Sequence, residues 1–119
     1  MNVLIVESRP ELAVLWQRHL ERQGMFVELA ASQDQAVDHL SAHDTDIIVL
    51  DLVLEGGSAL AVSDFASYRW PKARVIFVTD TTFFSDGSIF NHACNACAFL
   101  PAATPPEDLA AMVEHYAAH

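Results

Sequence analysis

The stretch IVLDLVLEGGSAL, residues 48–60, opens as an apolar run and meets its first acid at Asp51. An apolar run without polar interruption is typical of a strand buried on both faces, as in a parallel sheet. The pair Gly56-Gly57 then predicts a turn, and the residues from Ser58 predict a helix. Asp51 therefore ends a buried strand, where an acid can cap a helix, bind a ligand or react. Because the next helix begins several residues later, we favour the last two roles.

The same alternation of apolar strand and amphipathic helix extends to both sides of this stretch. We predict strands over residues 3–6, 25–30, 46–51, 74–79 and 96–100. We predict helices that begin near Pro10, Ser32, Ser58, Thr81 and Thr104, of which the segment 81–94 carries the weakest pattern. Strands and helices that alternate in this way predict an α/β doubly wound fold, with a five-stranded parallel sheet and helices on both faces.

Two of these helices carry residues that are typical of a helix start. Ser32 and Gln35 form a capping box, in which both side chains satisfy free backbone N–H groups of the first turn. Thr104 is the predicted N-cap of the last helix, with Pro105 at the first helical position and Glu107 three residues after the cap. These signals support helices after the second and the fifth strand.

The composition is that of a globular protein with one core. The chain has 119 residues, 52% of them hydrophobic, and we expect a single domain over residues 1–119. The N-terminal MNVLIV predicts a strand without signal-peptide features. No apolar run reaches the roughly 20 residues that a membrane span needs. We therefore expect a cytoplasmic protein with no membrane partner.

The charge balance is strongly acidic. The chain has 6 basic and 16 acidic residues, for a formal net charge of -10. Binding to nucleic acid depends on Lys and Arg at the phosphates, so direct nucleic-acid binding is disfavoured. The acidic surplus favours cationic partners or bound metal ions instead.

Several polar residues follow the predicted strands where their carboxyl ends meet. This edge of a parallel sheet holds the ligand site in open α/β folds. Glu7 and Asp51 repel each other if both are ionised, and a divalent cation with oxygen ligands relieves that repulsion. An Asp held beside a cation is also suited to attack phosphorus. For Glu7, capping of the next helix stays an equally good interpretation.

Four stretches together resemble a bacterial response-regulator receiver domain over essentially the whole chain. They are VLIVES (3–8), DIIVLDLVLEGGSAL (46–60), RVIFVTD (74–80) and ACAFLPAATPPEDL (96–109). Each stretch alone is a modest signal, whereas their order and spacing together are specific. The resemblance implies a flavodoxin-like (βα)5 fold in two-component signalling.

The resemblance also implies a role for each matching position. Asp51 would be the phosphoacceptor for a histidine kinase, and Thr79 would hydrogen-bond the phosphoryl group. Phe99 would act with Thr79 as a switch and change rotamer. Mg²⁺ would be bound by Glu7, Asp51 and the backbone carbonyl of Val53.

Two positions depart from the family pattern. Ser8 stands where the family has the more direct acidic metal ligand, and a hydroxyl is a poor substitute for a carboxylate on Mg²⁺. Ala102 stands where the family has a lysine that pairs with the phosphoryl oxygens, and the only lysine, Lys72, precedes the fourth strand at the opposite edge. We therefore expect Mg²⁺ binding to be weak or lost, and phosphorylation to be weakened.

Arg9 has two interpretations. It could turn into the acidic pocket and supply positive charge there. We favour the other interpretation, that of a solvated residue on the first turn of the first helix.

Three functions from different classes fit these observations to different degrees. The first is a phosphoacceptor in a phosphorelay, with no enzyme activity beyond self-catalysed phosphorylation and dephosphorylation. The second is a pseudo-receiver, which uses the same fold as a phosphorylation-independent protein-interaction module. The third is a small enzyme or cofactor binder of the same shape, and the lack of a phosphate loop in ESRPEL (7–12) disfavours it.

The resemblance further implies partners. A histidine kinase or phosphotransfer protein would donate the phosphoryl group. An output protein, or a second copy of the chain, would bind the face made by the fourth helix, the fifth strand and the last helix. That region holds several large apolar side chains, most of which we assign to the core: Phe83, Phe84, Ile89, Phe90 and Phe99.

Cys94 and Cys97 form a CxxC pair without a second pair in the chain. We favour two structural thiols over a metal site or a redox pair.

Overall fold

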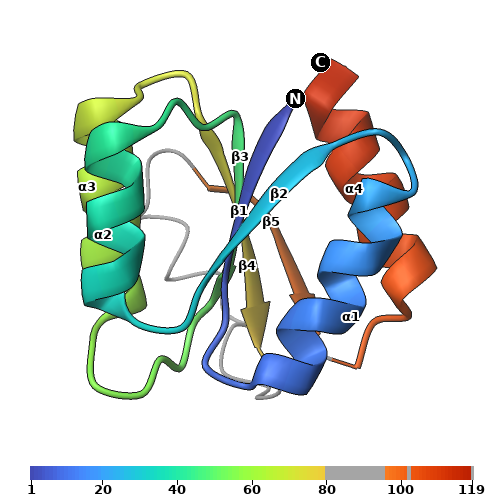
Figure 1. Cartoon of the computed structure of the whole chain (residues 1–119), viewed down its shortest axis with the longest axis horizontal. Helices are drawn as coiled ribbons and strands as arrows, with labels where there is room; N and C mark the ends of the chain where they lie inside the picture. The colour runs from blue at the N-terminus through green and yellow to red at the C-terminus, as the bar shows by residue number, and fades with distance from the viewer. Residues whose placement is uncertain (80–95, 102, 119) are drawn as a thin grey trace.

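The computed structural model describes residues 1–79, 96–101 and 103–118 (Figure 1). Its strands are β1 (Asn2–Val6), β2 (Phe26–Ala30), β3 (Ile47–Asp51), β4 (Arg74–Thr79) and β5 (Ala96–Pro101). Its helices are α1 (Pro10–Glu21), α2 (Gln33–Ala42), α3 (Ala59–Arg69) and α4 (Pro106–Ala118). The helix predicted over 81–94 lies outside the described residues, so α4 is the predicted last helix.

The strands form one parallel sheet in the order β2-β1-β3-β4-β5. The chain moves outward from β1 to β2, crosses back to β3, and then continues in the other direction. The strand order therefore reverses between β1 and β3, where Val3 pairs with Ile47 and Val6 with Leu50. This arrangement confirms the predicted doubly wound α/β fold.

Helices cover both faces of the sheet, with α1 and α4 on one face and α2 and α3 on the other (Figure 1). Successive side chains of a strand point to opposite faces, so each strand contributes to both cores. In β3, Ile47 and Val49 pack on the α1 and α4 side, whereas Ile48 and Leu50 pack on the α2 and α3 side. The central strands β1, β3 and β4 are mostly apolar because helices cover both of their faces, whereas edge strand β2 is partly exposed to water.

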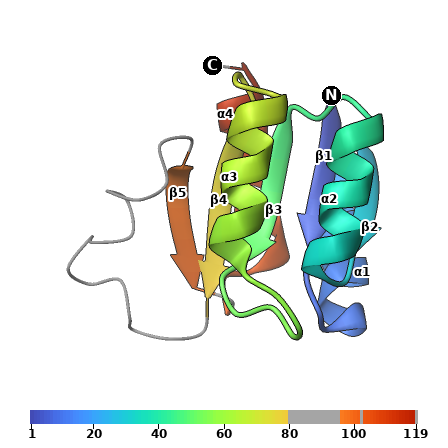
Figure 2. The same ribbon diagram turned by 90° about the vertical axis from the view of Figure 1, so that its left-hand side faces the viewer.

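The carboxyl ends of the strands lie together at one edge of the sheet, opposite the two termini (Figure 2). Glu7 directly follows β1 at this edge, Asp51 ends β3, and Thr79 ends β4. The predicted meeting of these strand ends is therefore confirmed.

The helix starts agree with the sequence in one case and differ in another. The Ser32 side chain accepts a hydrogen bond from the Gln35 amide at 3.2 Å, and the Gln35 side chain accepts one from the Ala31 amide at 2.8 Å. The last helix begins at Pro106, one residue later than predicted. The carbonyl of Pro105 accepts from the amides of Asp108 and Leu109, which makes Pro105 the residue before the first helical position.

Among the described residues, no helix combines the length and the apolar character that crossing a bilayer requires.

The first prediction concerns the core under α2 and α3. Leu50 is fully buried there, whereas Leu29 on edge strand β2 is 37% exposed. We expect Leu50→Ala to lower the free energy of unfolding by about 2–5 kcal/mol, because it removes buried methylene groups and leaves a cavity. Urea unfolding followed by tryptophan fluorescence measures the change. Leu29→Ala is the matched control, and an equal loss in both variants would contradict the assignment of Leu50 to the core.

Candidate functional site

Asp51 is the last residue of β3 and is 5% exposed. Its Oδ1 accepts a hydrogen bond from the Val53 amide at 2.9 Å, which holds the carboxylate at the strand end. The N-cap of the following helix is Ser58, whose hydroxyl accepts from the Ala61 amide at 3.3 Å. Asp51 is therefore not a helix cap, as the spacing predicts.

Glu7 continues the line of β1 into the same edge. Its amide donates to the Ala30 carbonyl at 3.0 Å, which extends the ladder between β1 and β2 by one residue. The residue is 2% exposed, and its Oε2 accepts from the Ser8 amide at 3.0 Å. The N-cap of α1 is Arg9 and not Glu7, so the capping interpretation of Glu7 is wrong.

Arg9 joins the two acids. Its Nε and Nη2 each lie 2.9 Å from Glu7 Oε1, and its Nη2 lies 3.3 Å from Asp51 Oδ2. The side chain of Arg9 is 41% exposed, but its charged end contacts buried carboxylates. The prediction that Arg9 is simply solvated is therefore wrong.

The local backbone explains why Arg9 points inward. Arg9 has an extended conformation, with φ -91° and ψ 106°, and Pro10 opens the helix after it. A residue before proline is held away from the helical region, so Arg9 stays beside the strand ends and does not join the first helical turn. The two carboxylates then attract its guanidinium.

Burial and the neighbouring Asp51 raise the pKa of Glu7. The pKa of Glu7 is raised to about 8, mainly by burial and then by the hydrogen bond to Asp51 and the negative charge of Asp51, while Arg9 acts in the opposite direction. A carboxylic acid with this pKa keeps its proton over most of the neutral range. The protonated Glu7 and the Asp51 carboxylate can then share a hydrogen bond without repulsion.

The Ser8 hydroxyl has a structural role that the sequence did not indicate. It donates to the Ala31 carbonyl at 3.0 Å and accepts from the Glu55 amide at 3.1 Å. Ser8 therefore ties the loop after β2 to the loop after β3. Nothing in the local sequence reveals this role, because both partners are backbone groups distant along the chain.

A second connection holds the same loop. The Gln33 side chain accepts from the Ser58 amide at 2.8 Å. A Cβ added at Gly57 would lie 2.5 Å from the Gln33 Cβ, so only glycine fits at this approach. Gly56 supplies the turn with φ +71°. The sequence predicts the turn from this pair but not the contact with α2.

The other predicted site residues are placed to different extents. Thr79 is 4% exposed and follows Val78, the residue of β4 that pairs with Asp51. Val53 contacts Asp51 through its amide, and the residue is 62% exposed. Phe99 belongs to β5, but its side chain lies outside the described part of the structure. The same holds for several predicted residues: Phe83, Phe84, Ile89, Phe90, Cys94, the side chain of Cys97 and Ala102.

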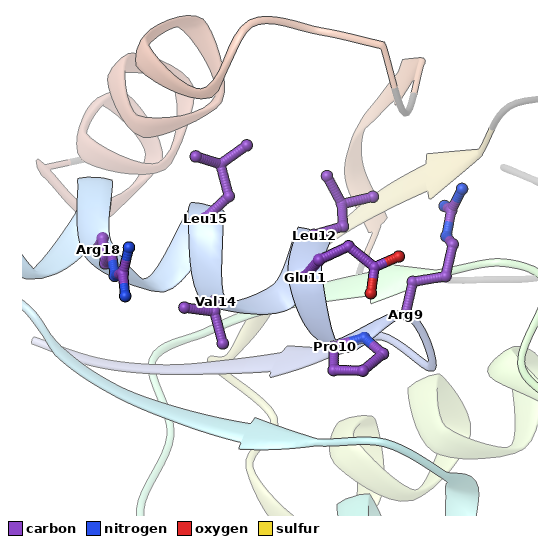
Figure 3. Close-up of a pocket in the computed structure, with 7 residues that line it drawn as sticks. All are labelled: Arg9, Pro10, Glu11, Leu12, Val14, Leu15 and Arg18. Atoms are coloured by element: carbon purple, nitrogen blue, oxygen red, sulfur yellow. The ribbon is translucent and has the colours of Figure 1, made fainter.

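A groove runs along α1 from the acidic pocket. Its volume is about 920 Å³, and its lining consists of Arg9, Pro10, Glu11, Leu12, Val14, Leu15 and Arg18. Figure 3 shows Arg9 and Arg18 at opposite ends of the groove, with the apolar side chains between them. The groove therefore links a charged strand-end site to an apolar helix surface.

The described side chains do not fit a hydrated Mg²⁺ between Glu7 and Asp51. Mg²⁺ requires oxygen ligands in near-octahedral geometry. Both oxygens of each carboxylate already accept a hydrogen bond or contact Arg9, whose guanidinium bridges the pair. The Ser8 hydroxyl is held by two backbone groups. Among residues 1–79, 96–101 and 103–118, no group of three or more His, Cys, Asp or Glu side chains is arranged to hold a metal ion.

The chain also matches a known protein family. The family model of the response regulator receiver domain matches residues 3–114. The chain belongs to the response-regulator receiver domain family. It is thus the receiver domain of a two-component response regulator, and the resemblance seen in the sequence is confirmed.

Solved receiver structures have the same fold at low sequence identity. A CheY-like receiver domain protein from Methanospirillum hungatei JF-1 has a TM-score of 0.88 at 20% identity, over 98% of this chain and 93% of that chain. The response regulator TrrA from Thermotoga maritima, in complex with Mg²⁺-BeF, has a TM-score of 0.83 at 18% identity, over 97% of each chain.

A third similar structure contains a phosphorylated aspartic acid. It is a response regulator from Burkholderia pseudomallei with a phosphorylated aspartic acid, a calcium ion and citrate. Its TM-score is 0.80 at 24% identity, over 96% of this chain and 71% of that chain.

Receiver domains are in general phosphoacceptors without enzyme activity of their own. They typically bind Mg²⁺ at the acidic pocket, and they interact with kinases or phosphotransfer proteins and with output domains.

The second prediction is a dependence of stability on pH that arises from Glu7. The pKa of Glu7 is 4.5 in the unfolded chain and about 8 in the native state. Between these two pH values, the native state binds up to one more proton at Glu7 than the unfolded state does. The free energy of unfolding therefore falls as pH rises across this window, by at most roughly 1.4 kcal/mol per pH unit for one proton. We expect Glu7→Gln, which cannot ionise, to remove most of this fall.

Urea unfolding at several pH values within that window measures the effect. Glu11→Gln changes an exposed acid of α1 and should keep the pH dependence of the wild type. An unchanged pH dependence in Glu7→Gln would show that Glu7 is already ionised in the native state.

The third prediction tests the loop connection made by Ser8. We expect Ser8→Ala to lower the free energy of unfolding by about 1 kcal/mol, because the Ala31 carbonyl and the Glu55 amide lose their shared partner. Ser41→Ala is the control, because its hydroxyl donates only within its own helix, to Asp38. Thermal unfolding separates the two variants, and a loss in Ser41→Ala as large as that in Ser8→Ala would argue against the connection.

Proposed function

We propose that Asp51 is the phosphoacceptor of this receiver domain and takes its phosphoryl group from a histidine kinase or a phosphotransfer protein. One observation carries the proposal. The Asp51 carboxylate stands beside the point where the strand order reverses, oriented by the Val53 amide and paired with a second acid and a cation. This is the position in an open α/β sheet where ligands bind.

The proposed transfer needs little from the protein beyond position and charge. An oxygen of Asp51 attacks the phosphorus of a phosphohistidine, an acyl phosphate bond forms, and the P–N bond breaks. The imidazole leaves and takes up a proton. We assign to Thr79 a hydrogen bond to the transferred group and to Phe99 the rotamer change of a switch. Self-catalysed phosphorylation and dephosphorylation belong to the same proposal.

We propose that phosphorylation of Asp51 is slower than in receiver domains with the complete family pattern. Ser8 cannot act as an acidic ligand, and Ala102 offers no fixed charge to the phosphoryl oxygens. The family pattern assigns Mg²⁺ to Glu7, Asp51 and the carbonyl of Val53. Because Arg9 already contacts both carboxylates, we propose that Mg²⁺ binding by these groups is weak or lost. Each missing charge contact slows a step that depends on electrostatic stabilisation.

A second candidate function is a pseudo-receiver that works as an interaction module without phosphorylation. The bridge from Arg9 to both acids favours it, because Asp51 is already paired and only 5% exposed. The engaged Ser8 hydroxyl favours it as well.

The remaining parts of the proposal concern extent and partners. We treat residues 1–119 as one receiver domain in the cytoplasm. An output protein or a second copy would bind the face of the predicted fourth helix, β5 and α4.

The fourth prediction tests phosphorylation directly. Incubated with Mg²⁺ and acetyl phosphate, the wild type should gain the mass of one phosphoryl group, and Asp51→Asn should gain none. Asp46→Asn is the control and should behave as the wild type, because Asp46 lies just before β3, at the opposite end of the strand. Intact mass spectrometry measures the gain. No gain in the wild type, together with no binding of beryllofluoride, would favour the pseudo-receiver.

A further inference from the structure

The acidic pocket contains its own cation. The guanidinium of Arg9 contacts Glu7 Oε1 through two nitrogens at 2.9 Å and Asp51 Oδ2 through one at 3.3 Å. A guanidinium is always charged, and its planar donors can serve two carboxylates at once. These contacts place a fixed positive charge between the same two acids that a divalent ion would bridge.

We propose that Arg9 takes the place of the divalent cation in this pocket, so that the receiver domain is neutralised without metal. The proposal deepens the proposed function by naming the charge that accompanies Asp51, and its phosphorylation arm rests on that function. The positioning of Arg9 itself rests only on the observed contacts.

Burial makes this arrangement hard to displace. The side chain of Glu7 is 0% exposed and that of Asp51 is 7% exposed, whereas Arg9 reaches them from a side chain that is 41% exposed. Removal of a partner from a buried ionic group leaves an uncompensated charge, which is strongly unfavourable. An incoming Mg²⁺ would have to lose water and also displace the guanidinium from both acids.

The residues around the pocket hold Arg9 in place and offer few further ligands to a metal ion. The extended backbone of Arg9 before Pro10 keeps its side chain beside the strand ends. The Ser8 hydroxyl, the nearest candidate for a further ligand, is held by the Ala31 carbonyl and the Glu55 amide. A metal would therefore gain few ligands for the contacts that it breaks.

If Arg9 occupies the place of the cation, its removal should strengthen the binding of a divalent cation. Without the guanidinium, Glu7 and Asp51 become free to bind a divalent cation. Arg9→Ala and Arg9→Gln should therefore bind Mn²⁺ at least about tenfold more tightly than the wild type, a change of the size seen when groups around a metal site are altered. Arg9→Lys should gain less, because an ammonium keeps the charge but cannot bridge both acids in the same way.

The experiment is a Mn²⁺ titration of the full chain, with free Mn²⁺ measured by electron paramagnetic resonance. Arg18→Ala removes an exposed arginine of α1 that contacts neither acid in the described structure, and it should bind Mn²⁺ as weakly as the wild type. The double variant Glu7→Gln with Arg9→Ala should lose the gain, which would locate the bound ion in this pocket. Circular dichroism verifies that each variant is folded, and Arg9→Gln and Arg9→Lys serve if Arg9→Ala is not.

Two outcomes would overturn the proposal. One is tight Mn²⁺ binding by the wild type, which requires no variant to interpret. The other is a folded Arg9→Ala or Arg9→Gln variant that binds no more tightly than the wild type.

A second arm adds acetyl phosphate with a chelator or with Mg²⁺. In this reaction a phosphoryl group passes to Asp51 and acetate is released. We expect equal phosphorylation of the wild type in both conditions and a requirement for Mg²⁺ in Arg9→Ala. A wild type that needs Mg²⁺ would contradict the proposal. No phosphorylation in any condition would contradict the proposed function alone, because the Mn²⁺ titration still decides the role of Arg9.

Discussion

Two acidic side chains, Glu7 and Asp51, are buried side by side at the carboxyl edge of the sheet, and this constraint shapes the site. Buried carboxylates are tolerated only if they are neutralised or hydrogen-bonded. Here the neutralisation has two parts: the pKa of Glu7 is raised to about 8, and Arg9 contacts both carboxylates. Both features lower the electrostatic cost of burying the two acids at the strand ends.

The topology of the sheet creates this constraint. Because the strand order reverses between β1 and β3, Glu7, which directly follows β1, and Asp51, which ends β3, lie on neighbouring strands. The helices that follow them lie on opposite faces, α1 on one and α3 on the other, so neither helix start covers the gap between the strand ends. The fold therefore brings the acids together and leaves room there for a cationic side chain or a ligand.

The loop after β3 is held by contacts of a different kind. Ser8 connects it to Ala31, the residue before the N-cap of α2. Gln33, the first residue of α2, accepts a hydrogen bond from the amide of Ser58 at the end of the same loop. Ser8, which stands where the family has an acid, thus holds the loop after β3 through hydrogen bonds to two backbone groups.

The sequence by itself determined the fold class, the strand ends and the family, because the continuous apolar runs and the spacing of the matching stretches are local properties of the chain. It also placed Glu7, Asp51 and Thr79 at one edge. Only the tertiary structure decided the role of Arg9, which the sequence left between solvent and pocket, and the partners of Ser8 and Gly57. Those outcomes depend on atoms far apart along the chain, such as Arg9 with Asp51 and Ser8 with Glu55. Their contacts form only once the sheet has set the separation of the loops, so no local pattern records them.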